Sequence, residues 1–333
     1  MEKRNKSKYF FTFLSIIVVG CIIYFLNNNS NSVLDENDKW VVDFFDDFNS
    51  FDDNNWQDQR IWVNNEKQCY LPNGEYGTRE VSDGTLKLKV INIDTAIDCD
   101  NMDKHGNQHP KTKYVAGRIA SKNRKEFVKG KWTARLRILG ESQKSMFPAW
   151  WVLGAQNNEP PVQEEDETVC WPLTGSGEID IFEHHGDYAV DHYTTGAIKS
   201  LGECDKGDWW SLRGSVTTTL SEFREYSVEW EENDLVYRLD ENEVYRNVGL
   251  GNNYPEPMFA ILNFAKITDT PIEGEWVIYN NSGSTQNKFQ QLNYLFKVLV
   301  SNKVSCITIY KTLFSYMTSG IYNHYLKNLF FKK

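Results

Sequence analysis

The fold of this chain is decided by strands with alternating side chains, of which the clearest is Lys131-Trp132-Thr133-Ala134-Arg135-Leu136-Arg137-Ile138. Apolar and polar residues alternate along it, as expected for a β-strand that buries one face and exposes the other. Thr85–Val90 and Tyr226–Trp230 repeat the pattern, and Asp234–Asp240 is the expected hairpin partner of the latter. Turn-like clusters separate such segments at intervals typical of a β-sandwich, namely Ser82-Asp83-Gly84, Glu232-Asn233-Asp234 and Asp240-Glu241-Asn242.

No long helical periodicity occurs between about Trp40 and Tyr279. We therefore predict an all-β fold, an antiparallel β-sandwich of jelly-roll type. A chain of 333 residues has room for one large β domain or two small ones. The region after Glu275 contains no Asp or Glu, and only Leu292–Val300 there resembles a strand, so a second catalytic domain is not expected.

The charge and the aromatic content restrict the partners of the protein. The formal net charge is −10, which would repel a phosphate backbone, so we exclude nucleic acid and keep a neutral polymer as a partner. Trp and Tyr are abundant, with 11 and 17 residues. Such rings build a large core or serve as flat platforms on which sugar rings stack.

The N-terminus has the pattern of an export signal. Basic residues precede an apolar run from Tyr9 to Leu26, and the polar stretch Asn27–Ser32 follows it. The run is close to the lower limit for spanning a bilayer, so a cleaved signal and an uncleaved membrane anchor both stay open. We expect residues 1–34 to be this segment and its linker, and the protein to be extracellular or periplasmic.

The cysteines agree with export. Cys69, Cys99, Cys170 and Cys204 are an even number suited to two disulfides, and they form no Cys-x-x-Cys pair of the kind that binds zinc. We expect Cys69 to pair with Cys99 and Cys170 with Cys204, although the sequence alone does not fix the connectivity.

The most informative segment for function is Gly177-Glu178-Ile179-Asp180-Ile181-Phe182-Glu183. In a regular strand Glu178 and Asp180 share one face, while Glu183 would point into the core. One extra residue, a β-bulge around Ile181-Phe182, returns Glu183 to the acidic face and Phe182 to the apolar one. Bulges of this kind are common beside active sites, where they redirect a side chain.

Three carboxylates on one strand face raise one another's pKa. Glycoside hydrolysis needs carboxyls with different pKa values, one protonated as the acid and the other ionised. Asp180 can share a proton with one of the two longer acids. The alternative is an exposed acidic strand on a solvated face. The Glu-x-Asp-x-x-Glu pattern alone also occurs by chance, so the residues around it decide between a catalytic strand and a solvated one.

The surroundings resemble glycoside hydrolase family 16, and the similarity extends from about Trp40 to Trp276. The family carries this Glu-x-Asp-x-x-Glu strand in the bulged form. The matching stretches follow in the expected order: Asn64–Tyr70, Tyr114–Ser121, Phe147-Pro148-Ala149-Trp150-Trp151, Trp171-Pro172, Glu225–Asp240 and Ile261-Leu262-Asn263.

The resemblance implies a jelly-roll enzyme with a concave substrate cleft that retains the anomeric configuration. By motif position Glu178 is the nucleophile, Glu183 the general acid/base and Asp180 an assisting group. The segment around Phe182 and the Asn-Asn-Glu stretch are most similar to the laminarinases, which cut β-1,3-glucan. The expected activity is endo-acting hydrolysis of that polymer. The candidate substrate-binding residues are Asn65, Glu66, Arg118, Trp151, Trp171, His192 and Asn263.

For each candidate contact the alternative is a structural role, and for the tryptophans it is core packing. We expect no cofactor and no metal site, because the adjacent His184 and His185 would point to opposite faces of a strand. The family's Asp-Trp-Val-Arg-like closing strand is not clear after Tyr279, and Leu292–Val298 is at best a degraded version. A structural Ca²⁺ near that strand and Asp43–Asp47 is therefore not supported.

We expect residues 35–282 to form the catalytic domain, residues 283–333 to be an extension of unknown role, and the protein to be a monomer. Two alternatives stay open. One is a hydrolase or transglycosylase acting on another β-glucan or on a galactan. The other is a non-catalytic glucan-binding protein, although such relatives typically lose the catalytic carboxylates that this chain keeps.

Overall fold

The computed structural model describes residues 40–103, 105–140, 143–159, 167, 171–172, 177–200, 209–269 and 274–286. These belong to one compact unit, Trp40–Gln286. The predicted export segment, residues 287–333 of the extension predicted for 283–333, and both Cys170 and Cys204 lie outside the described residues. Within the described part of the chain, no helix is long and apolar enough to cross a membrane.

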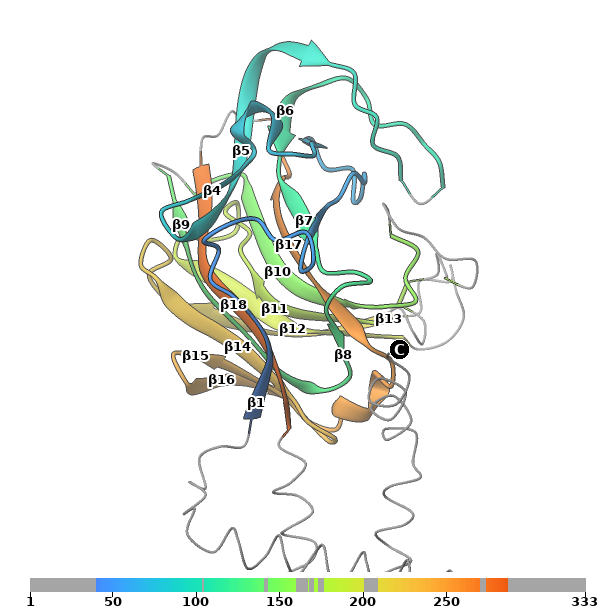
Figure 1. Ribbon diagram of the computed structural model, residues 1–333, viewed down its shortest axis with the longest axis vertical. Coiled ribbons are helices and arrows are strands. Elements are labelled where there is room, and N and C mark those ends of the chain that lie inside the picture. The colour runs from blue at the N-terminus through green and yellow to red at the C-terminus, as the bar shows by residue number, and fades with distance from the viewer. Residues whose placement is uncertain are drawn as a thin grey trace, which may run out of the picture. The chain divides into compact units, whose positions relative to one another are not determined.

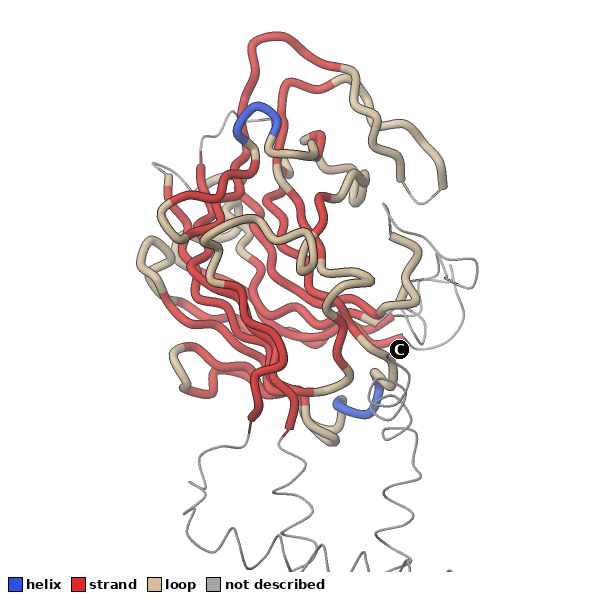
Figure 2. Tube along the Cα trace, in the orientation of Figure 1, coloured by secondary structure: helices blue, strands red, loops and turns tan. Residues whose placement is uncertain are grey.

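Two mostly antiparallel sheets form this unit, as predicted for a jelly-roll sandwich (Figures 1 and 2). The ten-stranded sheet contains β1 (Trp40–Asp46), β3 (Cys69–Tyr70), β4 (Arg79–Ser82), β5 (Thr85–Ile97), β6 (Thr112–Ala116), β9 (Gly130–Leu139), β14 (Arg224–Trp230), β15 (Leu235–Leu239), β16 (Asn242–Asn247) and β18 (Gly274–Gln286). The eight-stranded sheet contains β2 (Gln57–Asp58), β7 (Arg118–Ala120), β8 (Glu126–Phe127), β10 (Met146–Gly154), β11 (Glu178–Glu183), β12 (His192–Ser200), β13 (Trp209–Thr217) and β17 (Met258–Lys266). Two short 3₁₀ turns, η1 (Glu75–Gly77) and η2 (Gly251–Asn253), complete the described elements.

The strand order is β16-β15-β14-β9-β18-β5-β6-β3 in the larger sheet and β13-β12-β11-β10-β17-β7-β2 in the smaller one. The three alternating segments of the sequence lie in β9, β5 and β14, and β15 pairs with β14 as predicted. Asp83 and Gly84, with φ of 55° and 64°, form the tight turn between β4 and β5. One pairing differs from the antiparallel prediction, because β3 runs parallel to β6.

The last described strand, β18, occupies a central position in the larger sheet. β18 begins at Gly274 and lies between β9 and β5, while β1 pairs with its C-terminal half. Trp276 and Ile278 from this strand are fully buried in the core. The segment Leu292–Val298, predicted as a degraded closing strand, lies outside the described residues.

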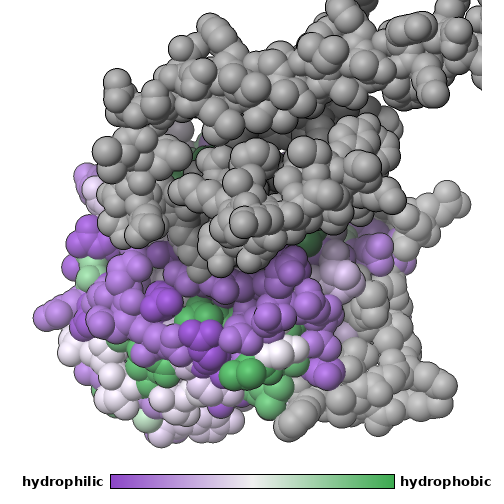
Figure 3. Space-filling view, turned by 90° about the horizontal axis from the view of Figure 1, so that it is seen from below, coloured by the Kyte–Doolittle hydropathy of each residue, from purple (hydrophilic) through white to green (hydrophobic). Residues whose placement is uncertain are grey.

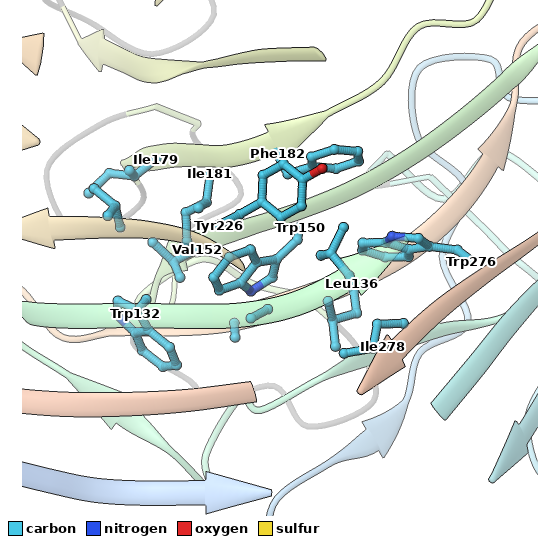
Figure 4. Packing of buried hydrophobic residues seen from close by; sticks show 14 of the residues in the cluster. Trp132, Leu136, Trp150, Val152, Ile179, Ile181, Phe182, Tyr226, Trp276 and Ile278 are labelled. Atoms are coloured by element: carbon cyan, nitrogen blue, oxygen red, sulfur yellow. The ribbon is translucent and has the colours of Figure 1, made fainter. Parts of the chain in front are cut away.

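The core lies between the two sheets and is rich in aromatic rings. Ile179, Ile181 and Phe182 point from β11 into the core that also contains Trp150 and Trp276 (Figure 4). The centroid of the Phe182 ring is 6.2 Å from that of Trp276, in a stacked arrangement. The described surface in Figure 3 is mainly hydrophilic, with hydrophobic residues scattered among polar ones.

A smaller apolar cluster surrounds the disulfide between Cys69 and Cys99, which confirms this predicted pair. The bridge links β3 to the segment after β5, and Leu71 and Val115 pack beside it. Residues 69 and 99 are 30 positions apart, so the crosslink restricts a sizeable loop of the unfolded chain.

Candidate active site

The predicted β-bulge is present in β11. On one side Trp151 pairs with Asp180 and Trp150 with Phe182, so Ile181 has no partner of its own. On the other side the register also shifts between Asp180 and Glu183. As a result the three carboxyls share one face of the strand, while Ile181 and Phe182 both enter the core.

Residues directly opposite one another on neighbouring strands form three rows on the acidic face of the eight-stranded sheet. The rows are Arg118, Asn263, Ala149, Glu183, Thr194 and Ser215; then Ala120, Ile261, Trp151, Asp180, Gly196 and Arg213; and finally Phe259, Leu153, Glu178, Ile198 and Ser211. The structure therefore brings three of the predicted substrate contacts, Arg118, Trp151 and Asn263, onto the face of the acids.

A single guanidinium joins two of the acids. Nη2 of Arg213 lies 3.1 Å from Oδ2 of Asp180, and Nη1 lies 2.7 Å from Oε2 of Glu183. Glu178 shares a side-chain hydrogen bond with Asp180, and its Oε2 accepts a second one, 2.8 Å long, from Nε1 of Trp171. The predicted site residue Trp171 is thus in direct contact with the predicted nucleophile.

Burial and mutual repulsion raise the pKa values of these acids. The pKa of Glu183 is raised to about 8, first by burial and then by the charge of Asp180, against the opposing effect of Arg213. Burial also raises the pKa of Glu178 well above its usual range, and Asp180 adds to this. The pKa of Asp180 is raised by burial and lowered by Arg213. At neutral pH the cluster therefore retains protons that isolated carboxyls would lose.

A chain of hydrogen bonds runs from Trp151 to Glu66. Nε1 of Trp151 donates to Oδ1 of Asn263 at 2.8 Å, and Nδ2 of Asn263 donates to the Tyr70 hydroxyl at 3.2 Å. That hydroxyl donates to Oε2 of Glu66 at 3.2 Å, and Gln68 donates to the same oxygen. Burial raises the pKa of Glu66 to about 7. Three predicted contacts are therefore parts of one network.

Arg118 is held inside the protein. It is 1% exposed, its Nη2 contacts both carboxylate oxygens of Glu159 at 2.9–3.0 Å, and its Nε donates to Gln59. Its guanidinium carbon also lies 5.2 Å from the centroid of the Trp151 ring. In this arrangement Arg118 supports Trp151, and a direct contact with sugar stays a prediction.

The remaining predicted contacts lie around this network. Asn65 is exposed in a turn with a φ of 54°. His192 begins β12 two residues before Thr194, which places it on the face of Glu183. Its carbonyl oxygen is 2.6 Å from Nδ1 of the buried His184. Within the described ranges, no three His, Cys, Asp or Glu side chains are arranged to hold a metal ion.

Sequence reasoning missed Arg213, Thr194 and Tyr70. A signal for Arg213 exists in β13, where Leu212 and Val216 pack against the core. Period two then directs Arg213 and Ser215 to the opposite face, which is the face of the acids. Finding their partners required the strand order, which the sequence does not provide.

Similarity to known proteins supports the fold described above. No protein-family model matches the sequence. The chain is 29% identical to a β-glucanase of Rhodothermus marinus over 136 residues, which are 40% of this chain and 42% of that protein. It is 24% identical to glucan endo-1,3-β-glucosidase A1 of Niallia circulans over 218 residues, 61% of this chain and 28% of that protein. The matches thus span less than half the length of these two relatives.

Among solved structures, the chain is similar to a LamA variant from Zobellia galactanivorans in complex with laminaritriose and laminaritetraose. The identity is 26%, the TM-score is 0.61, and the match covers 74% of this chain and 99% of that one. These relatives are glycosyl hydrolases of β-glucan. The chain has the laminarinase-like β-sandwich fold of glycoside hydrolase family 16.

Proposed function

We propose that the protein is a retaining, endo-acting hydrolase of β-1,3-glucan with Glu178 as nucleophile and Glu183 as general acid/base. The observation that carries the proposal is the bulged strand β11, whose three carboxyls share one face with raised pKa values. The similarity to enzymes that act on this polymer supports the choice of substrate.

In the first step, Glu183 donates its proton to the glycosidic oxygen while the Glu178 carboxylate attacks the anomeric carbon. The bond to the leaving sugar breaks and a glycosyl ester forms on Glu178. The pKa of Glu183, about 8, keeps this acid protonated at neutral pH. In the second step Glu183 takes a proton from water, the water oxygen attacks the anomeric carbon, and Glu178 leaves as the carboxylate.

Asp180 and Trp171 prepare Glu178 for the attack. The nucleophile must be ionised, whereas burial and Asp180 raise the pKa of Glu178 in the free protein, so the proton shared by the two acids has to move from Glu178 to Asp180 before the attack. The Trp171 N–H donates to Oε2 of Glu178 at 2.8 Å and stabilises the ionised form. Trp151 and Asn263 lie in neighbouring positions of the same face and are the proposed contacts to the sugar.

The test is reducing-sugar release by the purified full-length protein on laminarin, mixed-linkage glucan, agarose and carrageenan. We expect release from laminarin that Glu178→Gln abolishes, while Glu232→Gln, a change at an exposed carboxyl, leaves it intact. Release from another polymer alone would replace the substrate in the proposal. A folded protein that binds laminarin but releases no sugar would favour the glucan-binding alternative.

A further inference from the structure

Arg213 reaches the acids across Gly196, which lies between them in the sheet and has no side chain. The two residues pair directly across β12 and β13, and Gly196 pairs on its other side with Asp180. The Arg213 side chain therefore extends over a position that has no side chain and contacts two carboxyls on β11, at 3.1 Å for Asp180 and 2.7 Å for Glu183.

The glycine is required at this point of the sheet. A Cβ atom added to Gly196 would lie 2.1 Å from the carbonyl oxygen of Leu212 and 2.7 Å from Cα of Arg213. Both contacts are with backbone, which cannot move aside cheaply, so any other residue would push β13 away from β12. In this row Gly196 leaves space above the sheet, and the long side chain of Arg213 occupies that space.

We propose that Arg213 is a positioning residue that holds Asp180 and Glu183 together across Gly196 and assists the return of Glu183 from acid to base between the two steps. The inference rests on the proposed function, and it adds to it a residue outside the strand that carries the carboxyls.

The physical reason lies in how the charges around Glu183 change during the reaction. In the free protein, burial and Asp180 favour the protonated acid, and Arg213 opposes them. Once Glu178 has become a glycosyl ester, its negative charge is gone while the cation remains. The balance then moves toward the carboxylate, the form that accepts a proton from water. Loss of the cation should therefore slow the second step more than the first.

Other titratable groups near the pair are Glu178, two histidines, and the phenols of Tyr237 and Tyr254, whose pKa values are raised by burial and by the charge of Asp180. The pKa of His185 is lowered to about 4 by burial and by the Arg213 cation, so this ring is neutral in the working range. His192 lies on the same face as Thr194, which pairs directly with Glu183 across β12 and β11. A His192→Gln variant therefore controls for a pH effect that originates in this histidine.

The experiment compares Arg213→Met, which removes the charge, with Arg213→Lys, which keeps it, and uses Arg213→Gln as a second neutral variant should the first fail to fold. All are made in the full-length protein. Because an opposite charge at this distance moves a pKa by about 1–3 units, the basic limb of the kcat/KM profile on laminarin should move to higher pH by about that amount in the neutral variants. The lysine variant should retain most of the original profile.

A second readout follows the individual steps. With an aryl β-laminaribioside, a slower second step produces a burst of released phenol whose amplitude approaches the enzyme concentration in the neutral variants. A folded, active neutral variant with an unchanged basic limb and no burst would overturn the inference. So would a shift of the basic limb in His192→Gln as large as that in Arg213→Met.

An NMR titration distinguishes a failure of this inference from a failure of the proposed function. The carboxyl carbon of Glu183 can be titrated by NMR in ¹³C-glutamate-labelled protein and assigned with Glu183→Gln. If the wild type hydrolyses no tested polymer, the proposed function fails, and the role of Arg213 in the return from acid to base fails with it. The titration would then still decide the electrostatic contact. An identical midpoint in wild type and Arg213→Met would overturn that contact as well.

Discussion

Arg118 and Arg213 lie on the same face of the eight-stranded sheet, and both contact carboxylates, yet their surroundings differ. Arg118 is 1% exposed and is matched by one carboxylate, Glu159, whose side chain is 7% exposed. Arg213 is 30% exposed and contacts two of three neighbouring acids. At the first site the ion pair itself is balanced, and the nearby Glu66 carboxyl has a pKa raised by burial to about 7; at the second site one cation faces an excess of carboxyls.

This difference separates a structural site from a chemical one. A balanced, fully buried pair has no need to exchange protons, and breaking it leaves an isolated charge in the protein interior. An incompletely balanced cluster keeps protons at neutral pH, as the raised pKa of Glu183 indicates. We therefore expect substitutions at the two sites to affect different quantities, the free energy of unfolding at one and the rate of reaction at the other.

The largest expected effect is on catalysis at the unbalanced site. Glu183→Gln keeps the shape of the side chain but removes the exchangeable proton, so kcat on laminarin should fall by about 10²–10⁴-fold. The free energy of unfolding at pH 7 should not decrease. Steady-state kinetics and urea unfolding of the same preparation measure both. A variant that loses stability in proportion to its activity would contradict the separation of the two sites.

At the balanced site, Arg118→Met should destabilise the protein by about 3–5 kcal/mol, because Glu159 is left buried and unpaired. Urea unfolding measures this loss. The matched control is Arg246→Met, which breaks two more exposed pairs, with Asp234 and Glu243, and should cost no more than about 1 kcal/mol for each pair. Equal losses in the two variants would show that burial is not the deciding factor.

The pH dependence sharpens the comparison further. The kcat/KM on laminarin should fall as pH rises through about 8, where Glu183 loses its proton. The same group affects stability, because its pKa is higher in the folded protein than in the unfolded chain. The folded protein binds more protons between about pH 4.5 and about 8, so the free energy of unfolding should decrease as pH rises through that window.

Glu183→Gln should make the pH dependence of stability flatter in that window, whereas Arg118→Met should make it steeper, because the buried Glu159 and Glu66 carboxyls lose the cation that favours their ionised forms. Thermal melts at several pH values between 4.5 and 8.5 test this pair. If the wild type and Glu183→Gln have the same slope, another group, such as the buried Glu66, controls the window.

The alternation of side chains was sufficient to predict the fold class and several strands. Lys131–Ile138 and Tyr226–Trp230 reveal a buried and an exposed face by composition alone, and the structure has both as strands. The bulge could also be predicted, because a regular strand would have buried Glu183 and exposed Phe182. β18, which begins at Gly274, was not among the strands that the alternation of side chains predicted.

The site itself was predictable only where its residues lie on one strand. Glu178, Asp180 and Glu183 are close in sequence, so local periodicity relates them. Arg213 and Gly196 join them through pairings between β11, β12 and β13. Such pairings depend on the register of separate strands, which a single sequence does not specify.

The smallest expected effect compares two tryptophans on the acidic side of the sheet. Trp171 donates its N–H to the carboxylate of Glu178, whereas Trp151 donates to the neutral amide of Asn263. A hydrogen bond to a charged acceptor is worth about 1.5–3 kcal/mol, so Trp171→Phe should lower kcat roughly 10-fold or more while leaving KM nearly unchanged. Trp151→Phe removes a bond to a proposed sugar contact and should act mainly on KM. Kinetics on laminarin for the two variants separate these outcomes, and a larger loss of kcat in Trp151→Phe would reverse the assignment of the two rings.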